Sequence, residues 1–281
     1  MLLTQLPNSI LTSVHRREMR LMGINFEISV VADDEIWANE RINSAFGEIA
    51  RIEKLLTGTD PQSAASRINQ YAGIEPVKVD QEVYNLIDRS WKIAELTHGS
   101  FDITYGSASA NYRDIILQPA QTSVFLKEKG MKIDLAGVST GYIADRVKYF
   151  LQMQGVGSGV INVSGNLLTW GNQPDNQPWT VSTAAPSLSY GPIANLNISN
   201  MAIITSGSNG YFNTRTGMAV SNIKSVSILS PSAELAVAMG TPVMTMGVRL
   251  GLNLINRLNQ IACIIINHRK KTYTSKNLNY R

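Results

Sequence analysis

Short segments rich in glycine and serine, two of them carrying an aspartate, are the parts of this sequence best suited to chemistry. They are HGSFDIT (98–104), DLAGVSTG (134–141), VSGN (163–166), ITSGS (204–208) and NTRTG (213–217). Glycine and serine let a backbone approach a ligand closely and offer N–H donors to phosphate oxygens. Asp102 or Asp134 could accept a hydrogen bond from a ring or a ribose. Each loop alone could equally be a tight turn whose aspartate closes an Asx-turn, but their number favours a ligand pocket.

Several common chemistries are excluded by missing motifs. The three histidines, His15, His98 and His268, do not have metal-ligand spacing, and no G-x-S-x-G, C-x-x-C, H-E-x-x-H or Walker motif is present. The segment GVGSGV (155–160) lacks the third glycine of a dinucleotide fingerprint and precedes a predicted strand rather than a helix. A hydrolase of the usual types and a Rossmann fold are therefore not expected.

Composition indicates a globular domain of modest positive charge. The chain has 281 residues, of which 44% are hydrophobic and 16% charged, with a net charge of +4. A sizeable core is possible, and the mild basicity tolerates an anionic ligand without indicating nucleic-acid binding. The single cysteine, Cys263, stands in the apolar run IACIII and is expected to be a buried thiol.

Hydrophobic spacing predicts the helices of the first third. Residues 34–56 have the period of an amphipathic helix, a short helix follows Ser63 as N-cap, and a third helix over residues 81–99 ends at Gly99. Residues 15–33 are predicted to form a strand. Helices followed by mixed strands and helices indicate an α+β protein, which we predict to be a single unit over residues 1–281 with room for two lobes.

The elements around the small-residue loops complete the prediction. Residues 123–135 are expected to form two strands around Lys129-Gly130, and the next helix to begin at about Gly141. Residues 232–258 are predicted to be helical except near Gly240 and Pro242.

The order of the motifs makes the chain resemble the ApbE-type FAD:protein FMN transferase family over nearly its whole length. The matching segments are LMGINFEI, LLTGTDPQSAASRIN, THGSFDIT, DLAGVSTGYIADRV, VINVSGNLLTWG, ITSGS, NTRTG and SPSAELAVAMGTPVMTMG. No segment is specific by itself, whereas the collinear set is. The resemblance implies antiparallel sheets with packed helices in two related halves, similar to a tunnelling fold.

The resemblance also implies an activity. Family members bind FAD and, with Mg²⁺, transfer its FMN half to a threonine hydroxyl of a target flavoprotein. The metal bridges the diphosphate and neutralises the charge that develops as AMP leaves.

Site residues carry over by position. The resemblance places flavin-nucleotide contacts at Met22, Thr59, Ser100, Phe101, Asp102, Asp134 and Thr140, and metal contacts at the carbonyl of Gly137 and at Thr241. It thereby makes the segment after Asp134 one wall of a flavin diphosphate site.

This sequence departs from the family pattern at the reacting end. Val237 replaces the metal-binding aspartate, and Thr140 stands in the place of a lysine or glutamate. Asn213 replaces another aspartate of the family, and the histidine that precedes it in the family motif is missing. Ser164 and Asn166 replace residues of a GGD motif. Because Mg²⁺ requires oxygen ligands, Mg²⁺ binding is doubtful and catalysis is expected to be impaired.

Two readings of the function follow. The favoured one is an ApbE-like flavin-binding protein with impaired FMN transfer, and the alternative is a non-catalytic FAD-binding or protein-interaction homologue. Asp175 or Glu234 could replace the missing acid, although nothing in the sequence places either in the pocket.

The first residues have no basic segment followed by an apolar stretch and no cysteine to lipidate. No membrane span is expected. The chain as it stands predicts a cytoplasmic protein, or a periplasmic or membrane-anchored one if an export signal was removed.

Overall fold

The computed structural model describes residues 12–58, 60–107, 110–183, 193–207 and 222–278. Its largest element is a sheet, the main sheet, with strand order β1-β2-β6-β7-β10-β11-β12-β13, in which each neighbouring pair is antiparallel. Its strands are β1 (Ser13–Leu21), β2 (Ile24–Ala32), β6 (Gly159–Val163), β7 (Asn166–Trp170), β10 (Ala202–Gly207), β11 (Ile223–Ser230), β12 (Ala262–Asn267) and β13 (Thr272–Thr274).

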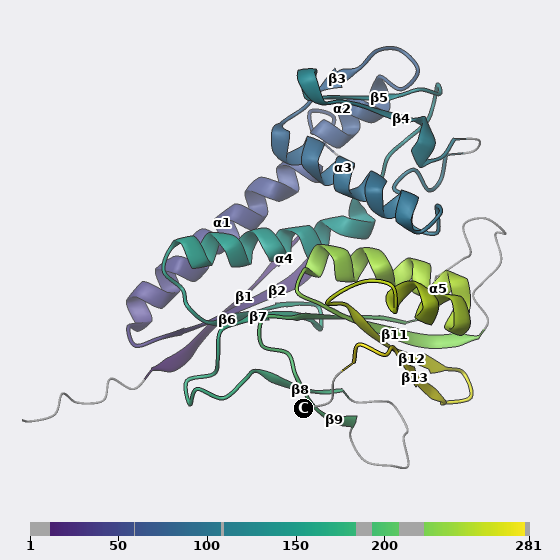
Figure 1. Ribbon diagram of the computed structural model, residues 1–281. Helices are drawn as coiled ribbons and strands as arrows, with labels where there is room; N and C mark the ends of the chain where they lie inside the picture. The colour runs from purple at the N-terminus through teal and green to yellow at the C-terminus, as the bar shows by residue number, and fades with distance from the viewer. Residues whose placement is uncertain (1–11, 59, 108–109, 184–192, 208–221, 279–281) are drawn as a thin grey trace, which may run out of the picture.

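The main sheet is covered by helices on one face and by a strand pair on the other (Figure 1). The helices are α1 (Glu35–Leu56), α4 (Ala136–Met153) and α5 (Ala233–Ile255), and the pair is β8 (Thr180–Thr183) with β9 (Ile193–Asn197).

Beyond these helices lies the small-sheet region, built on a sheet of order β3-β5-β4. It contains β3 (Val77–Lys78), β4 (Ile115–Gln118), β5 (Ser123–Leu126), α2 (Ala64–Gln70), α3 (Gln81–Leu96) and the 3₁₀ helices η1 (Tyr112–Asp114) and η2 (Pro119–Gln121). The predicted α+β class with antiparallel sheets is confirmed. The prediction of one unit over residues 1–281 and that of two related halves stay predictions.

The expected early helices form where the sequence signals place them. The Asp34 carboxylate caps α1 by accepting hydrogen bonds from two backbone N–H groups, and the Ser63 hydroxyl caps α2 through the N–H of Ser66. After α3, Gly99 adopts φ = 78° and its N–H donates to the carbonyl of Ala94 at 2.8 Å. These contacts satisfy backbone groups that a helix end leaves unpaired.

The single strand predicted over residues 15–33 is wrong, because the chain reverses in its middle. Met22 (φ = 54°) and Gly23 (φ = 72°) form a two-residue turn between the paired residues Leu21 and Ile24. Such a hairpin turn needs positive φ at both positions. Methionine is not typical of the first position, so the turn is not recognisable from the sequence. The N–H of Met22 donates to the Glu53 carboxylate at 3.2 Å, which ties the turn to α1.

The second strand expected after Lys129-Gly130 is also absent from this described part of the chain. The side-chain amide of Asn69 takes the place of a strand partner. Its Oδ1 accepts from the N–H of Ile133 at 2.7 Å, and its Nδ2 donates to the Ile133 carbonyl at 2.9 Å. The extended segment 131–135 is thus held by α2 rather than by a sheet.

Helix α4 begins at Ala136 and not at about Gly141 as predicted. Asp134 starts it, since its Oδ1 accepts a hydrogen bond from the N–H of Ala136 at 2.8 Å. Gly141 lies inside the helix, and glycine fits there because a Cβ would come within 2.4 Å of the Ala233 carbonyl oxygen of α5. The small residues that suggested a turn therefore allow two helices to pack closely.

Helix α5 is interrupted at Gly247 rather than near Gly240 and Pro242. Gly247 has φ = 80° and ψ = 174°, a conformation open to glycine and strained for other residues. Just before the break, the hydroxyl of Thr245 donates to the carbonyl of Thr241 at 2.9 Å. The second half of α5 consequently takes its own direction.

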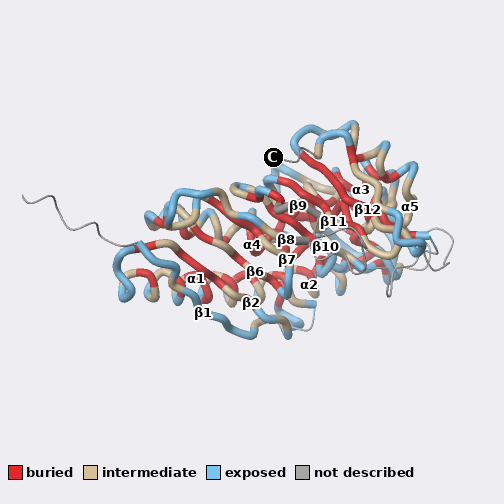
Figure 2. Tube along the Cα trace, turned by 90° about the horizontal axis from the view of Figure 1, so that it is seen from below, coloured by how far each residue is buried: buried red, intermediate tan, exposed pale blue. Residues whose placement is uncertain are grey.

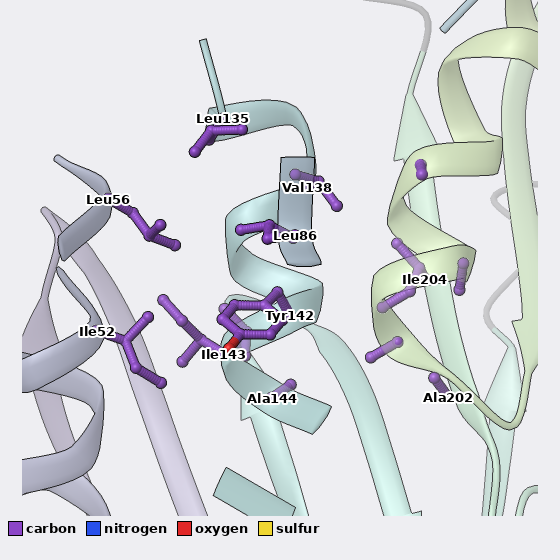
Figure 3. Close-up of a cluster of buried hydrophobic side chains, with 14 of the residues drawn as sticks. Ile52, Leu56, Leu86, Leu135, Val138, Tyr142, Ile143, Ala144, Ala202 and Ile204 are labelled. Atoms are coloured by element: carbon purple, nitrogen blue, oxygen red, sulfur yellow. The ribbon is translucent and has the colours of Figure 1, made fainter. Parts of the chain in front are cut away.

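The core lies between the main sheet and its helices. Figure 2 shows buried residues gathered along the strands, and Figure 3 shows Ile143 of α4 pointing toward Ile52 and Leu56 of α1. A smaller cluster that includes Leu196 fills the opposite face beneath β8 and β9. The core is continuous up to the helices that carry the candidate site.

Charged side chains link the small-sheet region to the helices on the main sheet. Glu82 of α3 contacts Arg51 of α1 at 2.8 Å and accepts a hydrogen bond from Tyr142 of α4. Arg89 of α3 forms a two-point ion pair with Glu234 of α5, with N–O distances of 2.7 and 2.9 Å. These contacts fix the position of α3 above α4 and α5.

Candidate functional site

Asp102 is fully engaged with its own loop. Its Oδ1 accepts from the N–H of Thr104 at 2.8 Å and from the Thr104 hydroxyl at 2.7 Å, and its Oδ2 accepts from the N–H of Tyr112 at 3.0 Å. The carboxylate therefore positions the segment between α3 and β4. Its geometry is that of an anchoring side chain, which is the turn-closing alternative that the sequence left open.

The loop of Asp102 lies against the start of α4. The N–H of Asp134 donates to the carbonyl of Ile103 at 2.7 Å, and Phe101 lies 3.9 Å from the Cβ position of Gly137. Phe101 is buried at 5% exposure, so it supports this junction from within the core. Ser100 is partly buried. Two of the predicted contact segments, 100–102 and 134–137, are thus brought together.

A second cluster forms one turn further along α4. Thr140 shares a small cavity of about 10 Å³ with Val237 of α5 and with Asn166 at the start of β7. Asn166 Oδ1 accepts a hydrogen bond from the N–H of Thr205 at 2.9 Å. The segments VSGN and ITSGS therefore meet α4 and α5 at the position of the missing aspartate.

Thr241 lies one turn after Val237 and is partly buried. The neighbouring Gly240 packs against β10, since its Cβ position is 2.9 Å from the hydroxyl of Ser206. The end of β10 thereby approaches the middle of α5, whereas Thr241 does not line the cavity of Thr140 and Val237.

Met22 lies on the hairpin turn between β1 and β2, at the same end of the main sheet as the turn of the VSGN segment. The register of β2 with β6 brings the 22–23 turn beside the 164–165 turn, and the N–H of Ser164 donates to the carbonyl of Asn25 at 3.1 Å. In the described part of the chain, no hydrogen bond joins Met22 to the Asp102 loop. Met22 is thus grouped with the VSGN turn rather than with residues 100–102.

Two parts of the sequence prediction fall outside the described residues. They are Thr59 and the segment NTRTG (213–217), which includes Asn213.

The side chains around Val237 do not fit a divalent metal of the family type. Mg²⁺ prefers near-octahedral oxygen ligands, some of them carboxylates. Thr140 and Thr241 offer hydroxyls, the Asn166 oxygen already accepts from Thr205, and Val237 offers no donor atom. Across the residues that the structure describes, no group of three or more His, Cys, Asp and Glu side chains could hold a metal ion.

The acids considered as substitutes are occupied elsewhere. The carboxylate of Glu234 faces Arg89 and its side chain is 9% exposed, and Asp175 accepts from the N–H of Gln177 in a surface turn. Burial raises the pKa of Glu234, against the opposing effect of Arg89. Neither carboxylate lines the cavity at Val237.

The start of α5 is fixed by Asp145 of α4. Its carboxylate accepts hydrogen bonds from the Ser232 hydroxyl at 2.8 Å and from the N–H groups of Ala233 and Glu234 at 2.9 Å each. Negative charge at a helix N-terminus also interacts favourably with the helix dipole. Val237 and Thr241 are therefore positioned by a rigid helix start.

A separate cleft has a volume of about 1260 Å³, and its lining includes neither Thr140 nor Val237. One wall is formed by residues of the segments 95–107 and 110–113, which include Ser100 and Asp102, and the other by residues around and after the break in α5, from Thr245 to Leu258. Figure 1 shows the end of α3 above α5. The cleft is large enough for a dinucleotide, since pockets for small molecules range from about 300 to 1,000 Å³.

The wall formed by α5 was missed at the sequence level. Its exposed side chains, such as Leu250, Asn253 and Arg257, belong to no recognisable motif. The break at Gly247 was the available signal, because a glycine in an otherwise helical pattern can mark a change of direction.

The antiparallel α+β architecture, with ligand-type loops gathered at helix starts and sheet ends, defines a fold that solved structures share. The structure of the ApbE protein from Thermotoga maritima superimposes with a TM-score of 0.82 at 20% identity, covering 94% of this chain and 97% of that chain. The flavin transferase ApbE from Vibrio cholerae gives a TM-score of 0.80 at 20% identity, covering 94% and 98%.

Sequence comparison identifies the family. The model of the ApbE family matches residues 22–265, and the chain therefore belongs to the ApbE family. The FAD:protein FMN transferase of Klebsiella pneumoniae (strain 342) is 28% identical over 284 residues, which cover 88% of this chain and 87% of that protein. The resemblance predicted from the collinear motifs is confirmed.

Helix α5 is long and apolar enough to cross a membrane by length and composition. It packs against β10 and β11 of the main sheet and carries buried residues in both of its halves. This is the pattern of a core helix.

Proposed function

We propose that this chain binds FAD in the cleft between residues 95–113 and the second half of α5, and that its capacity for Mg²⁺-dependent FMN transfer is impaired. Flavin binding is supported by membership of a family whose curated relatives are FAD:protein FMN transferases and by the size of the cleft. In this proposal the segments around Ser100 and Asp134 form the wall nearest the flavin nucleotide.

The observation that carries the impairment is the apolar side chain of Val237 at the junction of α4, β7 and α5. A metal there would supply the positive charge that neutralises the diphosphate. The described residues lack the carboxylates to hold it, so FAD is retained without efficient cleavage. A flavoprotein bearing an acceptor threonine would be the partner of any residual transfer.

Predicted roles are assigned to the site residues as follows. Asp102 anchors the loop, Asp134 starts α4, and the backbone around Gly137 lies beside Phe101. In this proposal Met22 lies toward the flavin end of the ligand, and Thr140 and Thr241 toward its reacting diphosphate.

The test combines binding with transfer. Calorimetry with FAD measures affinity, and incubation with FAD, Mg²⁺ and a threonine-bearing flavoprotein target measures attached flavin by in-gel fluorescence. We expect FAD binding without attachment at Mg²⁺ levels that saturate an active family member run in parallel. Stoichiometric attachment would refute the impairment, and a lack of FAD binding would refute the flavin function itself.

A further inference from the structure

We infer that Arg113 and Arg257, on opposite walls of the cleft, bind the diphosphate of the nucleotide and supply positive charge that a metal would otherwise provide. This inference rests on the proposed flavin function and names the groups that recognise the ligand. It concerns residues that the sequence motifs did not mark.

Arg113 is held in place by the contacts of its loop. Asn111 and Asp114 cap the η1 helix reciprocally, and the N–H of Tyr112 is bound by Asp102. The guanidinium of Arg113 lies 4.7 Å from the centre of the Tyr112 ring, which is itself 3% exposed. A cation over an aromatic face is oriented without losing its charge, so Arg113 is preorganised for an anion.

Arg257 extends the opposite wall, directly after the end of α5. Its backbone N–H donates to the carbonyl of Leu254 at 3.2 Å, and its exposed side chain lines the cleft. Among the described residues, neither Arg113 nor Arg257 forms an ion pair with a carboxylate. By contrast, Arg51 and Arg89 on the other side of α3 are both paired.

The cleft walls also carry two carboxylates, Asp102 and Glu95, whose effects on the positive charge of Arg113 and Arg257 differ. Asp102 accepts hydrogen bonds from three donors of its own loop, so its oxygens are directed to that loop and it forms no ion pair with Arg113 or Arg257 among the described residues. Glu95, in the last turn of α3, lies on the wall as an exposed side chain. The remaining lining is apolar or neutral, with Tyr105, Leu96 and Leu250 exposed by 61%, 43% and 59%.

A cleft with two arginines and exposed apolar side chains favours a ligand in which an anionic group is joined to flat apolar rings. Arginine binds phosphate through several N–H donors in a planar fork, and exposed tyrosine and leucine side chains cover aromatic ligand surface. FAD carries both features. Since Val237 offers no metal ligand, guanidinium groups provide the compensating charge in this chain.

The experiment measures the dissociation constants of FAD, ADP and riboflavin for the full chain, with Mg²⁺ and with EDTA. The variants are Arg113→Gln and Arg257→Gln, and Arg249→Gln is the matched control because Arg249 is exposed on the same part of α5 without lining the cleft. Circular dichroism and the melting temperature verify the fold of each variant.

We expect each cleft variant to weaken FAD and ADP binding about tenfold or more, which corresponds to about 1.4 kcal/mol, while riboflavin binding and the control stay unchanged. EDTA should leave the FAD affinity of the wild type unaltered. If the wild type binds FAD and both cleft variants bind it equally well, the arginine assignment is wrong and the flavin function stands. An equal loss for riboflavin would also overturn it, because the arginines would then act on the shape of the cleft rather than on phosphate. If the wild type binds no FAD, the proposed function fails first.

Discussion

Replacing Val237 by aspartate should create a metal site in this chain, if the proposed cause of impaired transfer is correct. Aspartate is close to valine in size, and its carboxylate would enter the cavity of about 10 Å³ beside Thr140 and Asn166. That space is about one water-sized sphere, so it holds the carboxylate, and a bound ion additionally requires small movements of the lining side chains. The variant therefore tests both the alignment with the family and the cause of the impairment.

The expected magnitudes follow from the surroundings of the new charge. Without metal, a partly buried carboxylate with poor hydrogen-bond partners costs about 1–3 kcal/mol. For a chain of this size each kcal/mol lowers the melting temperature by about 2–4 °C, so Val237→Asp should melt several degrees below the wild type in EDTA. A metal present at about one hundred times its dissociation constant returns about 2.7 kcal/mol, which offsets most of the loss.

The assay is a melting-temperature titration with Mg²⁺ for the wild type, Val237→Asp and Val237→Asn. The asparagine variant matches the shape and supplies an oxygen without charge, so it separates charge from size. We expect a Mg²⁺-dependent rise for the aspartate variant, a small one for asparagine and none for the wild type. Identical titration curves for all three proteins would show that residue 237 does not face a metal position.

Three further predictions concern packing and protonation. Gly141→Ala should destabilise the protein by about 1–3 kcal/mol in denaturant titrations, because the added methyl meets a carbonyl oxygen of α5 at 2.4 Å; Gly47→Ala in α1, where nothing lies within 4 Å, should stabilise it by up to about 1 kcal/mol. A loss at both positions would contradict this account. The hydrogen bond from Arg51 lowers the pKa of Glu48 below its ordinary value of 4.5. The ionised Glu48 carboxylate therefore stabilises the fold above pH 4.5, and this contribution is lost as the pH falls through the lowered pKa. Glu48→Gln should therefore show a shallower acid denaturation profile than the wild type, and an unchanged profile would disprove the link. Burial raises the pKa of Cys263 to about 12, so iodoacetamide at pH 8 should modify it after unfolding and not before; rapid labelling of the folded protein would count against this burial.

The parts of the fold that the sequence predicted are those with strong local signals. Helices α1 and α3 have long amphipathic periods, and Ser63 and Gly99 mark ends that the structure confirms. The order of the short motifs identified the family, although each motif alone resembled an ordinary turn. Collinearity carries information that single loops lack.

The errors arose where tertiary contacts replace local signals. A methionine occupies a left-handed turn position at Met22, and the side chain of Asn69 substitutes for a strand partner. Gly141 suggested a turn, although its role is close helix packing. For the site, the sequence indicated Asp102 as a ligand contact, which stays a prediction, and it did not reveal that three hydrogen bonds make Asp102 an anchor of its loop. The α5 wall of the cleft could not be found, since exposed residues without a motif become neighbours through folding alone.

The break at Gly247 separates a part of α5 that packs in the core from a part that lines the cleft. Buried residues before the break, such as Met239 and Val243, pack in the interior, where α5 contacts β10 and β11. Residues after it expose Leu250, Asn253 and Arg257 to the cleft. Ligand preference can therefore be altered at these three positions, by selection or by design, while the scaffold beneath keeps its packing.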